Sequence, residues 1–134
     1  KLINLFKEQI EKIKPNVIYV PHINDIHTDH QIVARAMNSF SKWFRYPYIN
    51  QINIYETISE TNFNFNESQF APNLFVDITD YLQKKIDISK IYASEIAEHP
   101  FPRSVKAIES YANIRGSVSG YKYAEAFQIM IKRK

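Results

Sequence analysis

The stretch "NVIYVPHINDIHTDHQIVARAMNSF", residues 16–40, combines three patterns that together indicate the fold class. Its first part, "NVIYV", has the continuous apolar character of a short buried strand, and Pro21 ends it. From Thr28 onward apolar residues recur at helical spacing, and Thr28 with Gln31 has the spacing of a capping box. Strand, polar loop and helix therefore form one βα unit. The positions that this helix is expected to bury are Ile32, Val33, Ala36, Met37, Phe40 and Phe44.

The rest of the chain continues the alternation of helices and short strands. The other expected elements are a helix ending at Lys14, a strand over 52–57, an irregular Asn- and Phe-rich loop over 58–73, an extended piece at "LFVDI", helices over 80–97 and 104–115 with Gly116 as a C-cap, and a final strand at "YKYAEAFQIMI". This order predicts an α/β sandwich. Ligands in such sheets bind beyond the carboxyl ends of the strands, which is where residues 22–30 lie.

Size and composition exclude several classes of protein. The 134 residues fit one domain, and 45% hydrophobic content is enough for a core. The net charge of +3 is concentrated in the terminal Lys132–Lys134 and gives little reason to expect nucleic-acid binding. Absence of cysteine excludes disulfides and thiolate metal sites and fits a reducing compartment. With no signal-peptide pattern and no apolar stretch near the roughly 20 residues that span a bilayer, we expect a cytoplasmic protein without a membrane span.

The polar loop contains the residues best suited to chemistry. His27 and His30 lie three residues apart at a helix start, so their side chains can converge, and Asp25 and Asp29 flank them. Imidazole and carboxylate are the ligands that zinc or iron(II) takes when thiolates are absent. A histidine that acts as an acid also needs a carboxylate to orient it. An ordinary capped helix N-terminus explains the same residues, and His22 is expected to be a loop or wall residue.

Beyond these residues, "VIYVPHINDIHTDHQIVARA" resembles the second metal motif of the PIG-L/LmbE-like de-N-acetylases, which remove acetyl from N-acetylglucosamine-type substrates with the help of zinc. The likeness continues through "IYET", "NLFVDITDYLQKKIDISKIYASE", "HPFPRSVKAIESYANIRG" and "GYKYAEAF", in the order of that family's C-terminal half. It implies that residues 1–134 are a single partial domain. The implied fold is part of a Rossmann-like sandwich with a mainly parallel sheet that lacks its N-terminal strands.

The resemblance also implies roles for individual residues. His30 matches the histidine that ligates zinc, and His27, oriented by Asp29, matches the group that stabilises the tetrahedral intermediate or protonates the leaving amine. Asp25 matches a commonly acidic position, while Arg115 and Glu125 match recurring positions that could bind substrate. The reaction implied is hydrolysis of the amide by water, with the metal polarising the carbonyl. The Asn- and Phe-rich loop could contact a sugar ring or be a mobile surface loop.

One part of the family pattern is missing. The other two zinc ligands and the general base come from an AHPDDE-like motif near the family's N-terminus, and this sequence, which opens inside a helix at Lys1, contains no such segment. A single histidine and a nearby carboxylate do not make a three-ligand catalytic site. We therefore expect a piece of a longer chain, or one of two associating chains, with little or no activity by itself.

Two other functions remain compatible with the sequence. The chain could be a non-catalytic binding or assembly module with a vestigial metal site, which would associate with a partner chain or with a second copy. A metal-dependent phosphoesterase is the weaker alternative, because such sites cluster more carboxylates than this sequence does.

Overall fold

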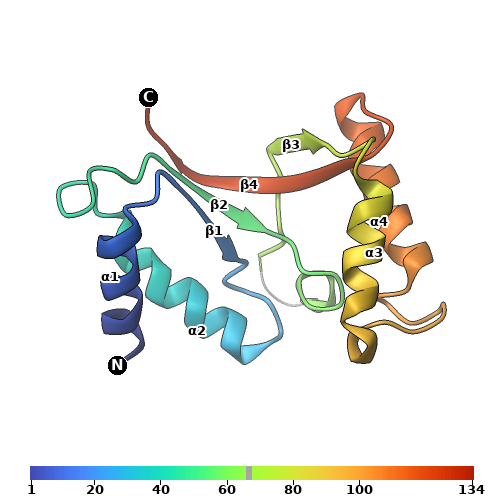
Figure 1. Cartoon of the computed structure of the whole chain (residues 1–134), viewed down its shortest axis with the longest axis horizontal. Coiled ribbons are helices and arrows are strands. Elements are labelled where there is room, and N and C mark those ends of the chain that lie inside the picture. The colour runs from blue at the N-terminus through green and yellow to red at the C-terminus, as the bar shows by residue number, and fades with distance from the viewer. Residues whose placement is uncertain (66–67) are drawn as a thin grey trace. The chain divides into compact units, whose positions relative to one another are not determined.

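The computed structural model describes residues 1–65 and 68–134, and the chain forms two compact units. Unit 1 consists of residues 1–72 and 127–134, and unit 2 of residues 73–126. The elements are α1 (Leu2–Ile13), β1 (Val17–Pro21), α2 (Thr28–Met37), β2 (Gln51–Tyr55), β3 (Leu74–Asp77), α3 (Leu82–Ile91), α4 (Val105–Ser119) and β4 (Ala124–Lys132), with short 3₁₀ turns at 38–41, 61–63 and 93–95 (Figure 1).

Unit 1 is built on the βα unit that the sequence predicts. β1 pairs with β2 in parallel, from Val17 opposite Gln51 to Pro21 opposite Tyr55, and β2 pairs with β4 in antiparallel orientation. The apolar face of α1 and the end of α2 pack on these strands. Their shared core consists of Ile10, Ile18, Val20, Met37, Phe40, Tyr46, Ile49 and Ile52. This packing anchors β1 and the end of α2, the two elements that the polar loop connects.

Unit 2 contains β3, the first residues of β4 and the helices α3 and α4. Ser104 caps α4 by accepting a hydrogen bond from the backbone N–H of Ala107 at 3.1 Å. The helix runs through Gly116 and ends at Ser119, and Gly120, with a φ of 81°, is its left-handed C-cap. A Cβ at Gly116 would lie 2.6 Å from the carbonyl oxygen of Tyr121, so glycine is required there by close approach of the backbone.

The α/β class is confirmed, and several local predictions are wrong. The cap of α2 is His27 rather than Thr28, because the helix already includes Thr28 and the His27 imidazole accepts the N–H of Asp29. Ile32 and Phe44 are exposed. Ile32 lies on α2 outside its buried positions Ala34, Ala36 and Met37, and Phe44 lies beyond the end of α2, after the 3₁₀ turn at 38–41. The helix expected over 80–97 ends at Ile91, and α4 passes the predicted cap at Gly116.

The sheet contains both a parallel and an antiparallel pair of strands. The parallel β1–β2 pair agrees with the predicted arrangement and the antiparallel β2–β4 pair departs from it. A mainly parallel, Rossmann-like sheet and a single partial domain therefore stay predictions. Within the described ranges, no helix has both the length and the apolar character needed to cross a bilayer.

Candidate functional site

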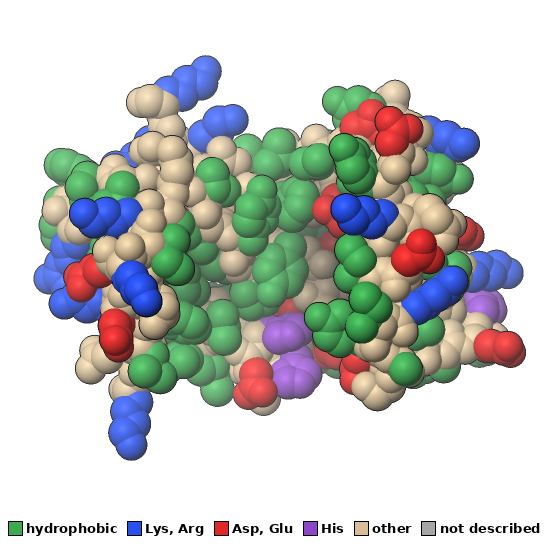
Figure 2. Space-filling view, in the orientation of Figure 1, with side chains coloured by type: hydrophobic (Ala, Val, Ile, Leu, Met, Phe, Trp, Pro, Cys, Tyr) green, Lys and Arg blue, Asp and Glu red, His purple; other side chains and the backbone are tan. Residues whose placement is uncertain are grey.

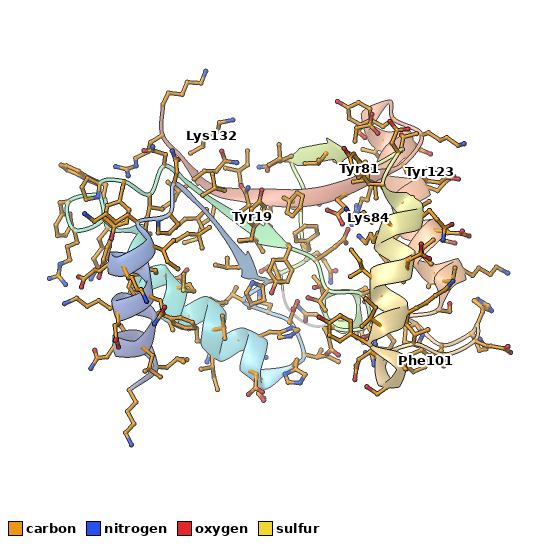
Figure 3. The ribbon with its side chains drawn as sticks, in the orientation of Figure 1. Tyr19, Tyr81, Lys84, Phe101, Tyr123 and Lys132 are labelled. Carbon is orange, nitrogen blue, oxygen red and sulfur yellow. The ribbon has the colours of Figure 1, made fainter. Side chains whose placement is uncertain are left out.

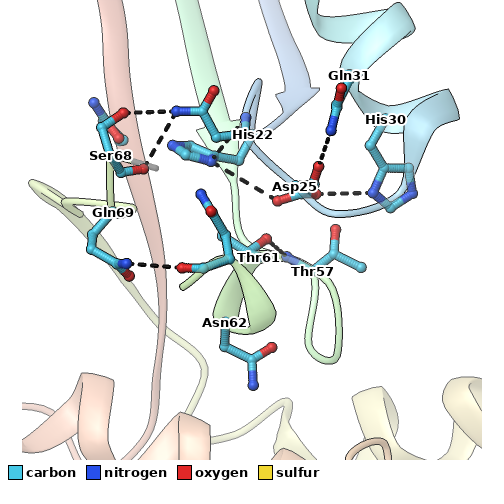
Figure 4. Close-up of polar contacts among 12 residues, drawn as sticks. His22, Asp25, His30, Gln31, Thr57, Thr61, Asn62, Ser68 and Gln69 are labelled. Atoms are coloured by element: carbon cyan, nitrogen blue, oxygen red, sulfur yellow. Dashed lines mark hydrogen bonds and ion pairs between the residues drawn. The ribbon is translucent and has the colours of Figure 1, made fainter. Parts of the chain in front are cut away.

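A buried carboxylate organises the loop between β1 and α2. Asp25 is fully buried, and its Oδ2 lies 2.9 Å from Nδ1 of His30 on the first turn of α2 (Figure 4). The loop is closed by its own backbone, because the N–H of Asp25 donates to the carbonyl of His22 at 3.2 Å. The Gln31 side-chain amide donates to the carbonyl oxygen of Asp25 at 2.7 Å. These contacts hold Asp25 against the helix start.

The contact with Asp25 determines which nitrogen of His30 is available. A carboxylate oxygen accepts hydrogen bonds, so Nδ1 of His30 must carry the proton that it shares with Oδ2. In the neutral ring, Nε2 then has the free lone pair. The side chain is 27% exposed, so this lone pair belongs to a ring that is only partly covered. A histidine oriented by a carboxylate through one nitrogen is the usual form of a metal ligand.

His27 has the opposite arrangement of its ring nitrogens. As the N-cap of α2 it accepts, through Nδ1, the backbone N–H of Asp29 at 3.2 Å. The neutral ring therefore carries its proton on Nε2. The rings of His27 and His30 are stacked, with centroids 4.9 Å apart and planes at 25°. The two rings thus lie against each other, and their convergence on one ligand stays a prediction.

His22 lies on the other side of Asp25 and is buried. Its Nδ1 accepts the backbone N–H of Asn24 at 3.3 Å and lies 4.0 Å from Oδ1 of Asp25. Burial lowers the pKa of the His22 imidazole below its ordinary value of 6.5, and the Asp25 carboxylate opposes this only in part. A neutral, buried imidazole agrees with the expectation that His22 is a wall residue.

The surroundings of Asp25 fit a cation nearby. Its Oδ1 is buried and has no hydrogen-bond partner in the described part of the chain, and a buried carboxylate that lacks full compensation is costly. The negative charge of Asp25, after burial, also raises the pKa of the Tyr55 hydroxyl at the end of β2. One imidazole and one carboxylate are nevertheless an incomplete set. Among residues 1–65 and 68–134 no three His, Cys, Asp or Glu side chains gather into a metal site.

The other residues predicted for the site are Asp29, Arg115 and Glu125. Asp29 contacts His27 through its backbone N–H, and the carboxylate held against a histidine is that of Asp25. Arg115 and Glu125 belong to unit 2, where Glu125 forms an ion pair with Lys85 at 2.5 Å. Tyr81 and Lys84, which are labelled in Figure 3, line a hollow of about 310 Å³ together with this pair. Roles for these residues in a site stay predictions.

Two residues at the loop, Gln31 and Tyr55, were not predicted as site residues. The capping-box pattern gives Gln31 a different partner, yet its amide holds the backbone of Asp25. The apolar pattern places Tyr55 only within a strand, although its position at the carboxyl end of β2, paired with Pro21, brings it to the level of the loop. The adjacency of β1 and β2 could have indicated Tyr55, whereas nothing in the spacing indicates the partner of Gln31.

The structure defines a protein with an α/β fold and a histidine–carboxylate pair at the carboxyl end of a parallel strand. No family model matches the chain, and no curated protein matches it. Among solved structures it is similar to the crystal structure of the conserved protein TT1542 from Thermus thermophilus, with a TM-score of 0.73 and 20% sequence identity over 97% of this chain. The chain spans 58% of the length of that protein. At this identity the likeness shows the fold alone.

Proposed function

We propose that the chain is the C-terminal part of a PIG-L/LmbE-like, zinc-dependent de-N-acetylase that acts on an N-acetylglucosamine-type amino sugar. The observation that carries the proposal is the pair formed by Asp25 and His30. A fully buried carboxylate fixes the histidine through Nδ1 and leaves Nε2 as a lone-pair donor on a partly exposed ring. This arrangement contributes little to a purely structural loop, where an apolar residue would avoid the cost of burying a charge.

His30 is the residue of this chain that would hold the metal, and Asp25 keeps it in the required tautomer. A bound zinc or iron(II) would supply the positive charge that polarises the amide carbonyl. The remaining ligands and the general base are proposed to come from an AHPDDE-like segment outside these residues. The orphaned Oδ1 of Asp25 supports a site that the described residues leave incomplete.

His27 is proposed to stabilise the developing negative charge. Because its Nδ1 accepts the N–H of Asp29, its Nε2–H can donate a hydrogen bond to a developing oxyanion. The α2 N-terminus, where His27 is the cap, favours negative charge. His27 therefore acts on the substrate, while Asp25 acts through His30.

A hollow beside Asp25 could accept the sugar. It has a volume of about 290 Å³, and its lining includes Gln31, Arg35, Phe63 and Phe65. The two phenylalanine rings lie 6.1 Å apart and are exposed, which suits stacking on the apolar face of a sugar ring. Amide and guanidinium groups supply donors for hydroxyls. Part of the predicted Asn- and Phe-rich loop, residues 66–67, lies outside the described residues.

The predicted mainly parallel, Rossmann-like sheet is supported by the outer strand β1. β1 is the outer strand in the order β1-β2-β4-β3, and its sequence contains no charged residue that would protect a free edge. The longer chain of the similar crystal structure is consistent with further elements. We propose that parallel strands outside residues 1–134 pair with β1 and complete a Rossmann-like sheet.

The test begins with the complete reading frame, which should encode an AHPDDE-like motif before Lys1. In the complete protein, His30→Ala should abolish zinc binding and release of acetate from N-acetylglucosamine compounds. Asp25→Asn should weaken zinc binding by about 10- to 100-fold, as expected for a residue that orients a ligand. Asp29→Asn is the matched control, and it should leave zinc content unchanged.

Two results would count against this function. An upstream sequence without the motif would remove the missing ligands, and zinc bound by His30→Ala at wild-type stoichiometry would show that the metal lies elsewhere. A metal-free protein that associates stoichiometrically with a second chain would favour the assembly module instead. Elemental analysis together with light scattering distinguishes these cases.

A further inference from the structure

The segment between α2 and β2 exposes two large aromatic side chains on a tight turn. Trp43 and Phe44 are each 64% exposed, and their rings meet edge to face with centroids 6.1 Å apart. The backbone N–H of Arg45 donates to the carbonyl of Lys42 at 2.9 Å, which closes the turn. Phe40 and Tyr46, on either side, are buried in the core of unit 1. We call residues 42–46 the aromatic turn.

Basic side chains accompany the aromatic turn. Lys42 and Arg45 flank the exposed pair, and the guanidinium of Arg45 lies 5.9 Å from the centroid of the Phe44 ring. Both residues line a hollow of about 590 Å³ together with Lys7 of α1. Glu11 also lines it, and lies 3.7 Å from the Lys7 ammonium. Figure 2 shows Lys and Arg side chains gathered around hydrophobic ones at the part of unit 1 that carries this turn.

The basic end of β4 is attached to the same loop. The guanidinium of Arg133 donates to the carbonyl oxygens of Pro47 and Ile49, and the backbone N–H of Arg133 donates to the carbonyl of Asn50 at 2.8 Å. Lys132 pairs with Gln51 at the start of β2, and Figure 3 labels its side chain at the end of β4. The sequence from His30 to Tyr55 contains Arg35, Lys42 and Arg45 and no acidic residue. Positively charged side chains thus flank the exposed aromatics in sequence, with Glu11 as an acidic residue in the lining of the adjoining hollow.

We propose that the aromatic turn is a contact surface for an anionic lipid bilayer. Trp and Phe on a rigid tip can enter the interface between headgroups and acyl chains, where tryptophan is enriched in membrane proteins. Lysine and arginine around the tip are attracted to anionic headgroups. Neither contribution gives lasting attachment alone, and their combination gives reversible binding.

The positive charge around the aromatic turn favours an anionic bilayer over a second copy of this chain as the binding partner. A second copy of this chain would bring an equally basic surface to Lys42, Arg45 and Lys132, so that like charges would oppose association. An anionic bilayer does not repel these side chains. Its headgroups attract the lysine and arginine side chains, and its interfacial region can take up the rings of Trp43 and Phe44. Binding to a bilayer does not depend on the proposed deacetylase activity.

Trp43 makes the test direct, because it is the single tryptophan of the chain. Mixing the 134-residue chain with vesicles of phosphatidylcholine containing a third phosphatidylglycerol should shift tryptophan emission to the blue. The protein should also sediment with these vesicles. Vesicles of phosphatidylcholine alone should bind much less, and high salt should release the protein, as expected for screened charges.

Matched variants separate the two contributions. Trp43→Ala/Phe44→Ala should lower sedimentation with anionic vesicles by about tenfold or more, since two large apolar side chains no longer leave water. Lys42→Gln/Arg45→Gln should lower binding while retaining the fluorescence signal of Trp43. The control is Tyr81→Ala/Tyr92→Ala, which removes two aromatics of unit 2 that are each 63% exposed, and it should bind like the wild type.

The outcomes that would overturn the proposal are equally specific. They are a folded wild type, verified by circular dichroism, that shows no blue shift with anionic vesicles, or undiminished sedimentation of Trp43→Ala/Phe44→Ala. A blue shift that appears without lipid as protein concentration rises, with a dimer in light scattering, would assign the turn to self-association and reject the bilayer.

Discussion

The helices α2 and α4 begin with two different kinds of cap, and of these two caps the one on α2 belongs to the candidate site. Ser104 of α4 is buried, and its hydroxyl accepts the N–H of Ala107. His27 of α2 is exposed and uses an imidazole nitrogen for the same purpose. Serine is among the best N-cap residues, whereas histidine is not. His27 is therefore a less favourable helix cap than Ser104, and it lies beside His30, which binds the buried carboxylate of Asp25. A less favourable cap is what we expect where the side chain has a chemical role.

The largest stability effect is expected inside α4. Gly116→Ala would place a Cβ 2.6 Å from the Tyr121 carbonyl oxygen and 2.7 Å from that of Lys122, so the turn after α4 would have to move. We expect a loss of about 3 kcal/mol in the free energy of unfolding, measured by urea denaturation. Ser117→Ala, one residue further along the helix, is the control. A loss below that of the control would show that the turn moves freely.

Substitutions of the two cap residues should change the free energy of unfolding by smaller amounts and in opposite directions. Ser104→Ala should cost about 1 kcal/mol because the Ala107 N–H loses its acceptor. His27→Ser should leave stability unchanged or raise it by about 0.5 kcal/mol, because a better cap replaces the imidazole. If the proposed function is right, the same His27 variant of the complete protein should lose the proposed deacetylase activity while retaining zinc. A variant that kept its activity would reduce His27 to an ordinary cap.

The smallest effect at neutral pH is expected for His22, and it should emerge on acidification. Burial lowers the pKa of the folded imidazole below 6.5, so the unfolded chain takes up a proton first. Stability from His22 is therefore complete above pH 6.5 and is lost as the pH falls toward the lowered pKa. Urea denaturation of His22→Asn should show a shallower decline below that pH than the wild type. His99→Gln, which removes an exposed imidazole, should follow the wild type.

Elements bounded by local signals were predictable from the sequence. Pro15 and Pro21 mark the end of α1 and of β1, and the alternation of apolar residues in β4 marks a strand. Glycine was harder to interpret, because Gly116 and Gly120 serve different needs. Gly120 supplies a positive φ, while Gly116 admits a backbone that approaches from residues 121–122. Spacing alone does not separate these two reasons.

The site shows the same limit. The convergence of His27 and His30 follows from helical geometry and was predicted. That Asp25 rather than Asp29 holds a histidine by its carboxylate depends on how the loop folds back, which in turn depends on the contacts of Gln31 and of the His22 carbonyl. Such contacts are set by three-dimensional closure. The sequence therefore indicated the residues, while the pairing implied by the resemblance, His27 with the Asp29 carboxylate, differs from the observed pairing of His30 with the Asp25 carboxylate.

The division of β4 between the two units has a consequence for synthesis of the protein. Residues 127–134 complete unit 1, yet they follow the whole of unit 2, residues 73–126, in the chain. During translation, β1 and β2 emerge long before the antiparallel neighbour of β2 has been made. Unit 2 can begin to fold while the first unit still has an unpaired strand, and a ribosome-bound chain at this stage would expose that edge to chaperones or to neighbouring chains.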